Sequence, residues 1–173
     1  ALAETPERIS GTWVLDVEAT EESVLAAPPN KAAEWFGLAA GYMVGLIYQF
    51  EKSGATIHTY GNANTRVYQF LSRQGTEIKY ISKNTQGTAT DTLTVSIVSD
   101  KNIKIIHTGS PEMGYLLWKR ENLDPRRTTP NDVKARLDAW VASLQKIMKP
   151  FDTHPARTEE WDDEALLHDG LTV

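Results

Sequence analysis

Two short motifs stand at the two ends of a run of alternating apolar and polar segments. Ser10-Gly11-Thr12-Trp13-Val14-Leu15 opens the run, and Trp118-Lys119-Arg120 closes it. In a sheet whose last strand pairs with its first, the Arg120 guanidinium can lie across the Trp13 ring as a cation on an aromatic face. The two motifs therefore predict a closed up-and-down barrel with Trp13 and Arg120 at its sealed end.

Short segments of alternating polarity, separated by turns, fill the sequence between these motifs. We expect eight strands, at residues 12–18, 42–51, 56–61, 66–72, 77–83, 89–98, 103–108 and 113–120. Short connections, mostly of roughly two to five residues, favour an antiparallel meander, because parallel neighbours need a long crossover. The fold class is therefore mainly β, an eight-stranded antiparallel barrel that is either filled by side chains or holds one small ligand. A flattened sandwich is the alternative architecture.

Two helices are expected outside the strands. Pro28-Pro29-Asn30 stops the chain after the first strand and precedes a helix near residues 31–40. Thr129-Pro130-Asn131-Asp132 predicts a second helix start, with Thr129 as N-cap, and Pro150 ends this helix. Its apolar stripe predicts an amphipathic C-terminal helix that packs on the outside of the barrel or, as the alternative, against a partner chain.

The charge of the chain is concentrated in its last segment. The formal net charge is −5, while residues 151–173 hold seven acidic residues against one arginine, which leaves the rest near neutral. We therefore expect a barrel domain at 9–123, the C-terminal helix at 124–150, and a mobile acidic tail at 151–173. Such a tail suits capture of a basic protein partner, although a solvated tail without function is the default interpretation. Without a basic stripe interleaved with aromatics, the sequence does not indicate nucleic-acid binding.

Composition also bears on compartment and membrane association. Cysteine is absent, so the chain has no disulfide and no thiolate nucleophile or metal ligand. The longest uncharged stretch, Phe36 to Phe50, is too short and too rich in glycine for a membrane helix. Ala1-Leu2-Ala3 has the small-x-small form found at a signal-peptidase cut. We expect a periplasmic or secreted protein whose leader was removed before Ala1 or at Ala3; an ordinary alanine-rich terminus is the alternative.

Strand parity predicts a polar set inside an apolar barrel. Gln69, Lys79 and Lys104 mark the outer face, which sends a ligand-binding set inward. The members of this set are Tyr48, Phe50, Arg66, Tyr68, Tyr80 and His107. A buried arginine with tyrosine hydroxyls can hold a carboxylate head group while aliphatic walls take an acyl tail. Arg66 also fits a solvated position at the rim, and His107 also fits an ordinary core or rim histidine.

Catalytic and cofactor motifs are missing from the sequence. It has no Gly-x-Ser-x-Gly elbow, His-Glu-x-x-His helix, phosphate-binding glycine loop or nucleotide fingerprint. His58 and His107 could face each other across the barrel, but they lack an inward carboxylate to complete a metal site. We therefore expect no cofactor, no metal and no catalysis. An inhibitor or immunity-type envelope protein that acts through its surface and an enzyme of unknown reaction are the two alternatives.

The motifs quoted above resemble those of the calycin superfamily, the lipocalins and fatty-acid-binding proteins, and are most similar to small bacterial lipocalin-like domains. The resemblance rests on Gly11-Thr12-Trp13, on Leu116-Leu117-Trp118-Lys119-Arg120 and on the strand spacing between them, and it covers roughly Ile9 to Leu123. It implies an eight-stranded barrel and non-catalytic binding of a small, fatty-acid-like ligand in the interior.

Overall fold

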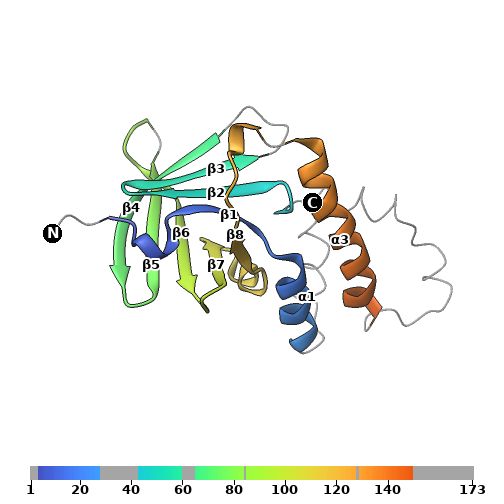
Figure 1. Cartoon of the computed structure of the whole chain (residues 1–173). Coiled ribbons are helices and arrows are strands. Elements are labelled where there is room, and N and C mark those ends of the chain that lie inside the picture. The colour runs from blue at the N-terminus through green and yellow to red at the C-terminus, as the bar shows by residue number, and fades with distance from the viewer. Residues whose placement is uncertain (1–3, 28–42, 60–64, 84, 128, 150–173) are drawn as a thin grey trace.

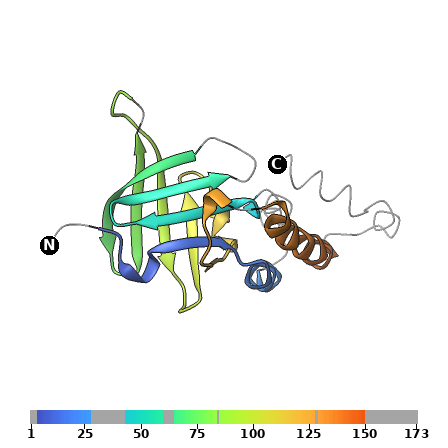
Figure 2. The same cartoon turned by 45° about the horizontal axis from the view of Figure 1, so that its top comes forward.

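The computed structural model describes residues 4–27, 43–59, 65–83, 85–127 and 129–149. Within these residues, eight antiparallel strands follow one another in sequence order around a closed barrel (Figures 1 and 2). They are β1 (Gly11–Leu15), β2 (Leu46–Glu51), β3 (Gly54–Thr59), β4 (Thr65–Gln74), β5 (Glu77–Lys83), β6 (Ala89–Ile97), β7 (Asn102–His107) and β8 (Trp118–Arg120). Pairing of β1 with β8, with Trp13 opposite Arg120, closes the barrel. The predicted fold class is confirmed.

The first strand is shorter than predicted because the chain turns into a helix at Asp16. The alternating pattern predicts a strand that continues to Glu18, but α1 (Val17–Ala26) begins at Val17 instead. The Asp16 carboxylate accepts a 3.1 Å hydrogen bond from the backbone N–H of Ala19 and so caps this helix. The residues that α1 buries recur at helical spacing: Val17, Thr20 and Val24. A helix after strand β1 is confirmed; the one expected near 31–40 lies outside the described residues.

The last strand is also shorter than predicted. A 3-10 helix, η2 (Pro111–Tyr115), precedes β8, so residues 113–117 are not part of the sheet. Proline has no N–H for a strand ladder, whereas its fixed φ suits the first turn of a helix. Leu117 is tied to α1 instead, since its N–H donates to the Thr20 hydroxyl at 3.0 Å. The expectation that strand pairing begins at Met113 is wrong for this reason.

The C-terminal helix α3 (Pro130–Met148) begins at the predicted position. The Thr129 side chain accepts from the backbone N–H of Asp132, and the Asp132 carboxylate accepts from the N–H of Thr129 at 2.8 Å. This reciprocal pair is a capping box, which satisfies two backbone donors that the first helical turn leaves without partners. A C-terminal helix with an apolar stripe is therefore confirmed.

Helix α3 lies beside α1, on one side of the barrel (Figures 1 and 2). The Ser143 hydroxyl donates to Glu21 at 2.5 Å, and Lys146 forms an ion pair with the same carboxylate at 3.3 Å. Arg136 donates to the backbone carbonyl of Val44, just ahead of β2, at 3.3 Å. Most of the stripe is buried, with Trp140, Val141, Leu144 and Ile147 belonging to the main hydrophobic cluster. The two helices thus cover part of the barrel, and α1 is a partner of α3 that neither alternative of the sequence prediction contained.

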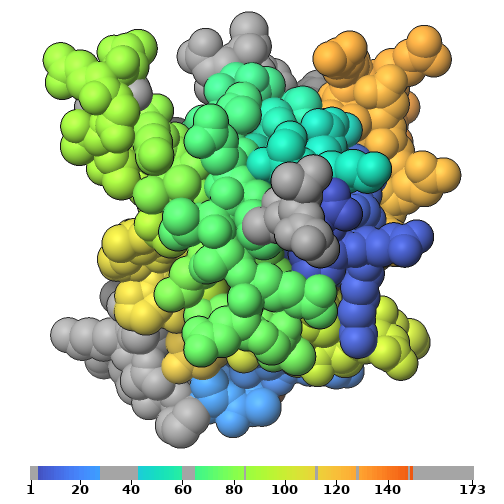
Figure 3. Space-filling view, turned by 90° about the vertical axis from the view of Figure 1, so that its left-hand side faces the viewer, coloured from blue at the N-terminus to red at the C-terminus, as the bar shows by residue number. Residues whose placement is uncertain are grey.

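The outer face of the barrel over β4 is open to solvent (Figure 3). Val67 and Leu71 on this face are 64% and 49% exposed, while Tyr68 between them points inward and is buried. Exposed apolar residues of this kind are common on soluble domains and do not by themselves mark an interface. None of the described helices is long and apolar enough to cross a membrane.

Candidate ligand site in the barrel

Trp13 and Arg120 come together at one end of the barrel. The Arg120 guanidinium carbon lies 5.1 Å from the centre of the Trp13 ring, so the cation covers the indole face. The indole N–H donates to the carbonyl of Ile9 at 2.8 Å, and Arg120 donates to the carbonyl of Arg8. Both carbonyls belong to a 3-10 helix, η1 (Glu7–Ile9). The indole, the guanidinium and η1 together seal this end.

Aromatic rings in mutual contact occupy much of the interior. The ring centres of Phe50 and Tyr80 are 5.4 Å apart, those of Phe70 and Tyr80 are 5.8 Å apart, and Tyr48 stacks on Phe50 at 6.3 Å. The Tyr80 hydroxyl lies 2.7 Å from the Thr5 hydroxyl. Burial raises the pKa of Tyr80 to about 12, although the hydrogen bond with Thr5 acts in the opposite direction. Phe50 and Tyr80, both in the predicted ligand-binding set, therefore pack on other rings.

A chain of hydrogen-bonded polar groups crosses the interior between β2, β4, β6 and β7. The Tyr48 hydroxyl lies 2.9 Å from Nε2 of His107, and Nδ1 of His107 lies 2.8 Å from Oδ2 of Asp91. The Tyr68 hydroxyl donates to the same Asp91 oxygen at 2.6 Å. Three members of the predicted set, Tyr48, Tyr68 and His107, are thus brought together by a carboxylate that the prediction did not contain.

Asp91 is ionised in this environment despite its burial. Burial alone would raise the pKa of Asp91, but the hydrogen bonds from Tyr68 and His107, with the charges of His107 and Arg66, lower it below its ordinary value. Burial, with the hydrogen bond to Asp91, raises the pKa of Tyr68. The phenol is therefore the proton donor and the carboxylate the acceptor in this pair.

The position of Asp91 was available from the sequence. The parity that places Leu93, Val95 and Ile97 of β6 on the inner face also places Asp91 there, two residues before Leu93. The expectation that the interior lacks a carboxylate is therefore wrong.

Arg66 lies at the rim, close to this polar chain. Its side chain is 62% exposed, and its guanidinium carbon lies 5.9 Å from the centre of the Tyr68 ring. One terminal nitrogen is 3.6 Å from Oδ2 of Asp91. The side chain thus occupies the solvated position that the sequence left open as one interpretation, while its charge still acts on the interior carboxylate.

Trp118 places an unsatisfied donor next to Tyr48. Its ring meets the Tyr48 ring edge-on, with centres 4.7 Å apart, and its side chain is fully buried. The indole N–H finds no hydrogen-bond acceptor within the described part of the chain. A buried donor without an acceptor costs about 1–3 kcal/mol. A ligand with a hydrogen-bond acceptor would remove this cost, so Trp118 is a site residue that the sequence prediction assigned only to the closing motif.

His58 does not share the interior with His107. Its Nε2 lies 2.9 Å from Oε1 of Gln49, a residue expected on the outer face, while Ile57 beside it is buried. Burial, followed by the charge of Arg126, lowers the pKa of His58. Among the residues that the structure describes, no three histidine, aspartate or glutamate side chains gather as metal ligands would. The predicted possibility of His58 facing His107 is thus wrong.

The chain matches no protein-family model, no curated protein and no solved structure. The interior offers aliphatic and aromatic walls, one unsatisfied N–H donor and one hydrogen-bonded carboxylate and imidazole, with an arginine at the rim. Apolar walls with a few fixed polar groups are typical of sites that take a mainly apolar molecule and orient it through a polar group.

Proposed function

We propose that this protein is a lipocalin-like member of the calycin superfamily that binds a small, mainly apolar ligand inside its barrel without catalysis. A closed barrel of eight antiparallel strands with one end sealed by Trp13 and Arg120 is compatible with this class. The ligand carries at least one hydrogen-bond acceptor, and a fatty-acid-like molecule meets this requirement. We place its action in the periplasm or outside the cell.

The unsatisfied N–H of Trp118 is the observation that carries the proposal. It is buried beside Tyr48, and Tyr48 is held in turn by His107. An acceptor on the ligand pairs with this N–H, while its apolar part packs on the walls formed by Leu93, Val95 and Ile105. An anionic head group would be attracted by Arg66 at the rim, whose exposed guanidinium can reach it.

Binding requires some of the interior rings to move. Tyr48, Phe50 and Tyr80 are in contact with their neighbours, so the ligand must displace rings rather than enter a void. Rotation of aromatic side chains between staggered conformers is the simplest route. The aromatic signals of these residues in NMR spectra should therefore change when the ligand binds.

Titration with a dansyl-labelled fatty acid tests the proposal. The probe should gain fluorescence in the presence of the folded protein, and Trp118→Phe should weaken its binding about tenfold, since one hydrogen bond to a buried donor is lost. Tyr48→Ala and Arg66→Ala should weaken it as well. Trp140→Phe is the matched control, because Trp140 is also buried with an unsatisfied indole N–H but lies on α3. Absence of probe binding, or equal effects of Trp118→Phe and Trp140→Phe, would contradict the proposal.

A hydrogen-bonded row of three side chains, Asp91, His107 and Tyr48, favours a second candidate function. This function is acid–base catalysis at the Tyr48 hydroxyl. A carboxylate that orients an imidazole, whose other nitrogen faces a hydroxyl, is an arrangement able to move a proton. Release of nitrophenol from a series of nitrophenyl esters would detect such an activity. If this site is catalytic, His107→Gln should abolish turnover. Trp118→Phe, which affects binding alone, should retain part of the turnover.

A further inference from the structure

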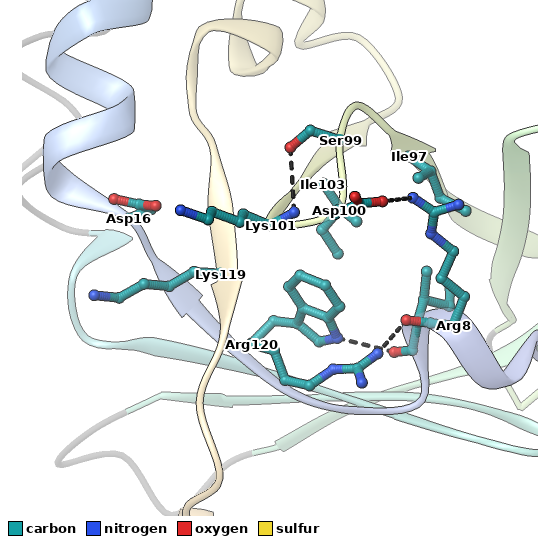
Figure 4. A pocket seen from close by; sticks show the side chains of 11 residues that line it. Arg8, Asp16, Ile97, Ser99, Asp100, Lys101, Ile103, Lys119 and Arg120 are labelled. Carbon is teal, nitrogen blue, oxygen red and sulfur yellow. Dashed lines mark hydrogen bonds and ion pairs between the residues drawn. The ribbon is translucent and has the colours of Figure 1, made fainter.

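A hollow lies beside Trp13 and Arg120, at the sealed end of the barrel and outside the interior described above (Figure 4). Its volume is about 480 Å³, which is within the range of pockets that hold small organic molecules. Apolar side chains form its base: Ile9, Trp13, Ile97 and Ile103. These residues are mostly buried, so the base is a firm surface backed by the core. We call this hollow the sealed-end groove.

Basic side chains predominate around the sealed-end groove. Of its described lining residues, four are basic and two are acidic, which gives the groove a net charge of +2 on a chain whose total charge is −5. Asp100 is neutralised by an ion pair, whereas Asp16 keeps its charge and accepts hydrogen bonds from neutral donors. Asp100 pairs with Arg8 at 3.0 Å, and Asp16 accepts hydrogen bonds from Asn102 at 3.0 Å and from the start of α1.

Among the described residues, Arg120, Lys101 and Lys119 form no ion pair with an acid, and Arg120 already covers the Trp13 ring. Lys101, in the turn between β6 and β7, and Lys119, on β8, line the groove from different elements. Figure 4 shows their ammonium ends on the same side of the groove, where Asp16 also lies. The two lysines together carry more charge than Asp16. Two cations from a turn and a strand, next to an apolar base, form a site for a molecule with one charged and one apolar part.

We infer that the sealed-end groove binds a small amphipathic anion, with a compact apolar body against Trp13 and its neighbours and one anionic group between Lys101 and Lys119. The charge complementarity selects an anion, and the groove volume limits the apolar body to a few fused or linked rings or a short chain. This site is separate from the barrel interior and does not depend on the ligand proposed there.

Anilinonaphthalene sulfonate is a suitable probe because it combines an aromatic body with one negative charge. We expect its fluorescence to rise on binding and the double substitution Lys101→Gln with Lys119→Gln to weaken binding about tenfold, as the loss of two ion pairs would. The same probe should shift the Trp13 indole N–H signal in NMR spectra of the unsubstituted protein. Lys134→Gln with Lys149→Gln, which removes the same charge from two exposed lysines at α3, is the control for total charge and should leave binding unchanged.

The neutral analogue phenylnaphthylamine separates the two sites, since it has the rings without the sulfonate. It should not compete for the sealed-end groove, and Trp118→Phe should not change binding of the anionic probe there. The inference is overturned if the double lysine variant binds the anionic probe as tightly as the unsubstituted protein. Competition by the neutral analogue, or no binding of the anionic probe at all, would overturn it equally.

Discussion

The hydroxyl of Tyr68 donates a 2.6 Å hydrogen bond to the carboxylate of Asp91, inside a barrel whose walls are otherwise apolar. The same carboxylate oxygen lies 2.8 Å from His107. A buried charge is tolerated when hydrogen bonds replace its lost hydration. The pair therefore fixes an ionised group next to the proposed ligand, and its removal should be measurable in both stability and pH dependence.

Substitution of Asp91 should destabilise the fold in a pH-dependent manner. Asp91→Ala should lower the free energy of unfolding by about 3 kcal/mol, because the buried Tyr68 and the partly buried His107 both lose their acceptor. Asp91→Asn retains an acceptor and should cost about 1.5 kcal/mol. Since the folded-state pKa of Asp91 lies below its unfolded value near 3.9, the contribution of the carboxylate is present above about pH 4 and lost as the pH falls through the folded-state pKa.

Urea denaturation of the unsubstituted protein and of Asp91→Asn, from about pH 7 to about pH 3, measures this effect. The difference in unfolding free energy between the two proteins should shrink toward acid pH. A difference that stays constant over this range would show that the Asp91 charge does not stabilise the folded state.

Tyr80 should govern part of the alkaline stability. Its folded-state pKa of about 12 exceeds the unfolded value near 10, so its contribution is complete below about pH 10 and lost as the pH rises toward 12. Tyr80→Phe should flatten this fall in stability and cost about 1 kcal/mol at neutral pH through loss of the hydrogen bond with Thr5. A double-mutant cycle with Thr5→Ala, followed by denaturation, checks the bond; strictly additive effects would exclude it.

Alternating polarity predicted the strands, and the motifs of Trp13 and Arg120 predicted that the strands close into a barrel. The predicted limits of β5 agree with the structure, and those of β3, β4, β6 and β7 differ by a few residues. The expected start of the second strand at residue 42 is wrong, since Val44 and Gly45 form a turn and β2 begins at Leu46.

The errors at β1 and β8 occur where a side chain or a proline competes with the ladder. Asp16 caps α1 through the N–H of Ala19, and Pro111 begins a 3-10 helix. A pattern of apolar positions contains no information about either competitor.

Strand parity predicted which side chains point into the barrel. It did not predict which of them form hydrogen bonds with one another. Tyr48, Tyr68 and Tyr80 were expected to point inward, and all three are buried. That Asp91 meets His107 depends on the register of β6 with β7 and on both rotamers. The unsatisfied N–H of Trp118 likewise depends on which acceptors the folded chain brings near it, which no local pattern determines.

The contact between Arg120 and Trp13 should contribute to stability. Arg120→Gln should lower the free energy of unfolding by about 1 to 2 kcal/mol, because it removes the cation from the indole face and the hydrogen bond to Arg8. Arg120→Lys retains the charge but loses the planar group, so an intermediate cost is expected. Lys119→Gln, at the neighbouring exposed position, should have little effect. Urea denaturation followed by tryptophan fluorescence compares the three; equal stability of Arg120→Gln and Lys119→Gln would exclude a stabilising contact.

Gly54 should be intolerant of a side chain because β4 approaches it closely. A Cβ atom at this position would overlap the backbone carbonyl oxygen of Tyr68, which cannot move without displacing the strand. Gly54→Ala should therefore cost about 2 to 3 kcal/mol, in the manner of an overpacked core, and should also shift Tyr68 relative to Asp91. Gly114→Ala is the matched control, since its Cβ would meet only the Ile106 side chain, at an ordinary 3.6 Å. Thermal denaturation of both variants tests the difference, and equal midpoints would mean that β3 and β4 adjust freely at this contact.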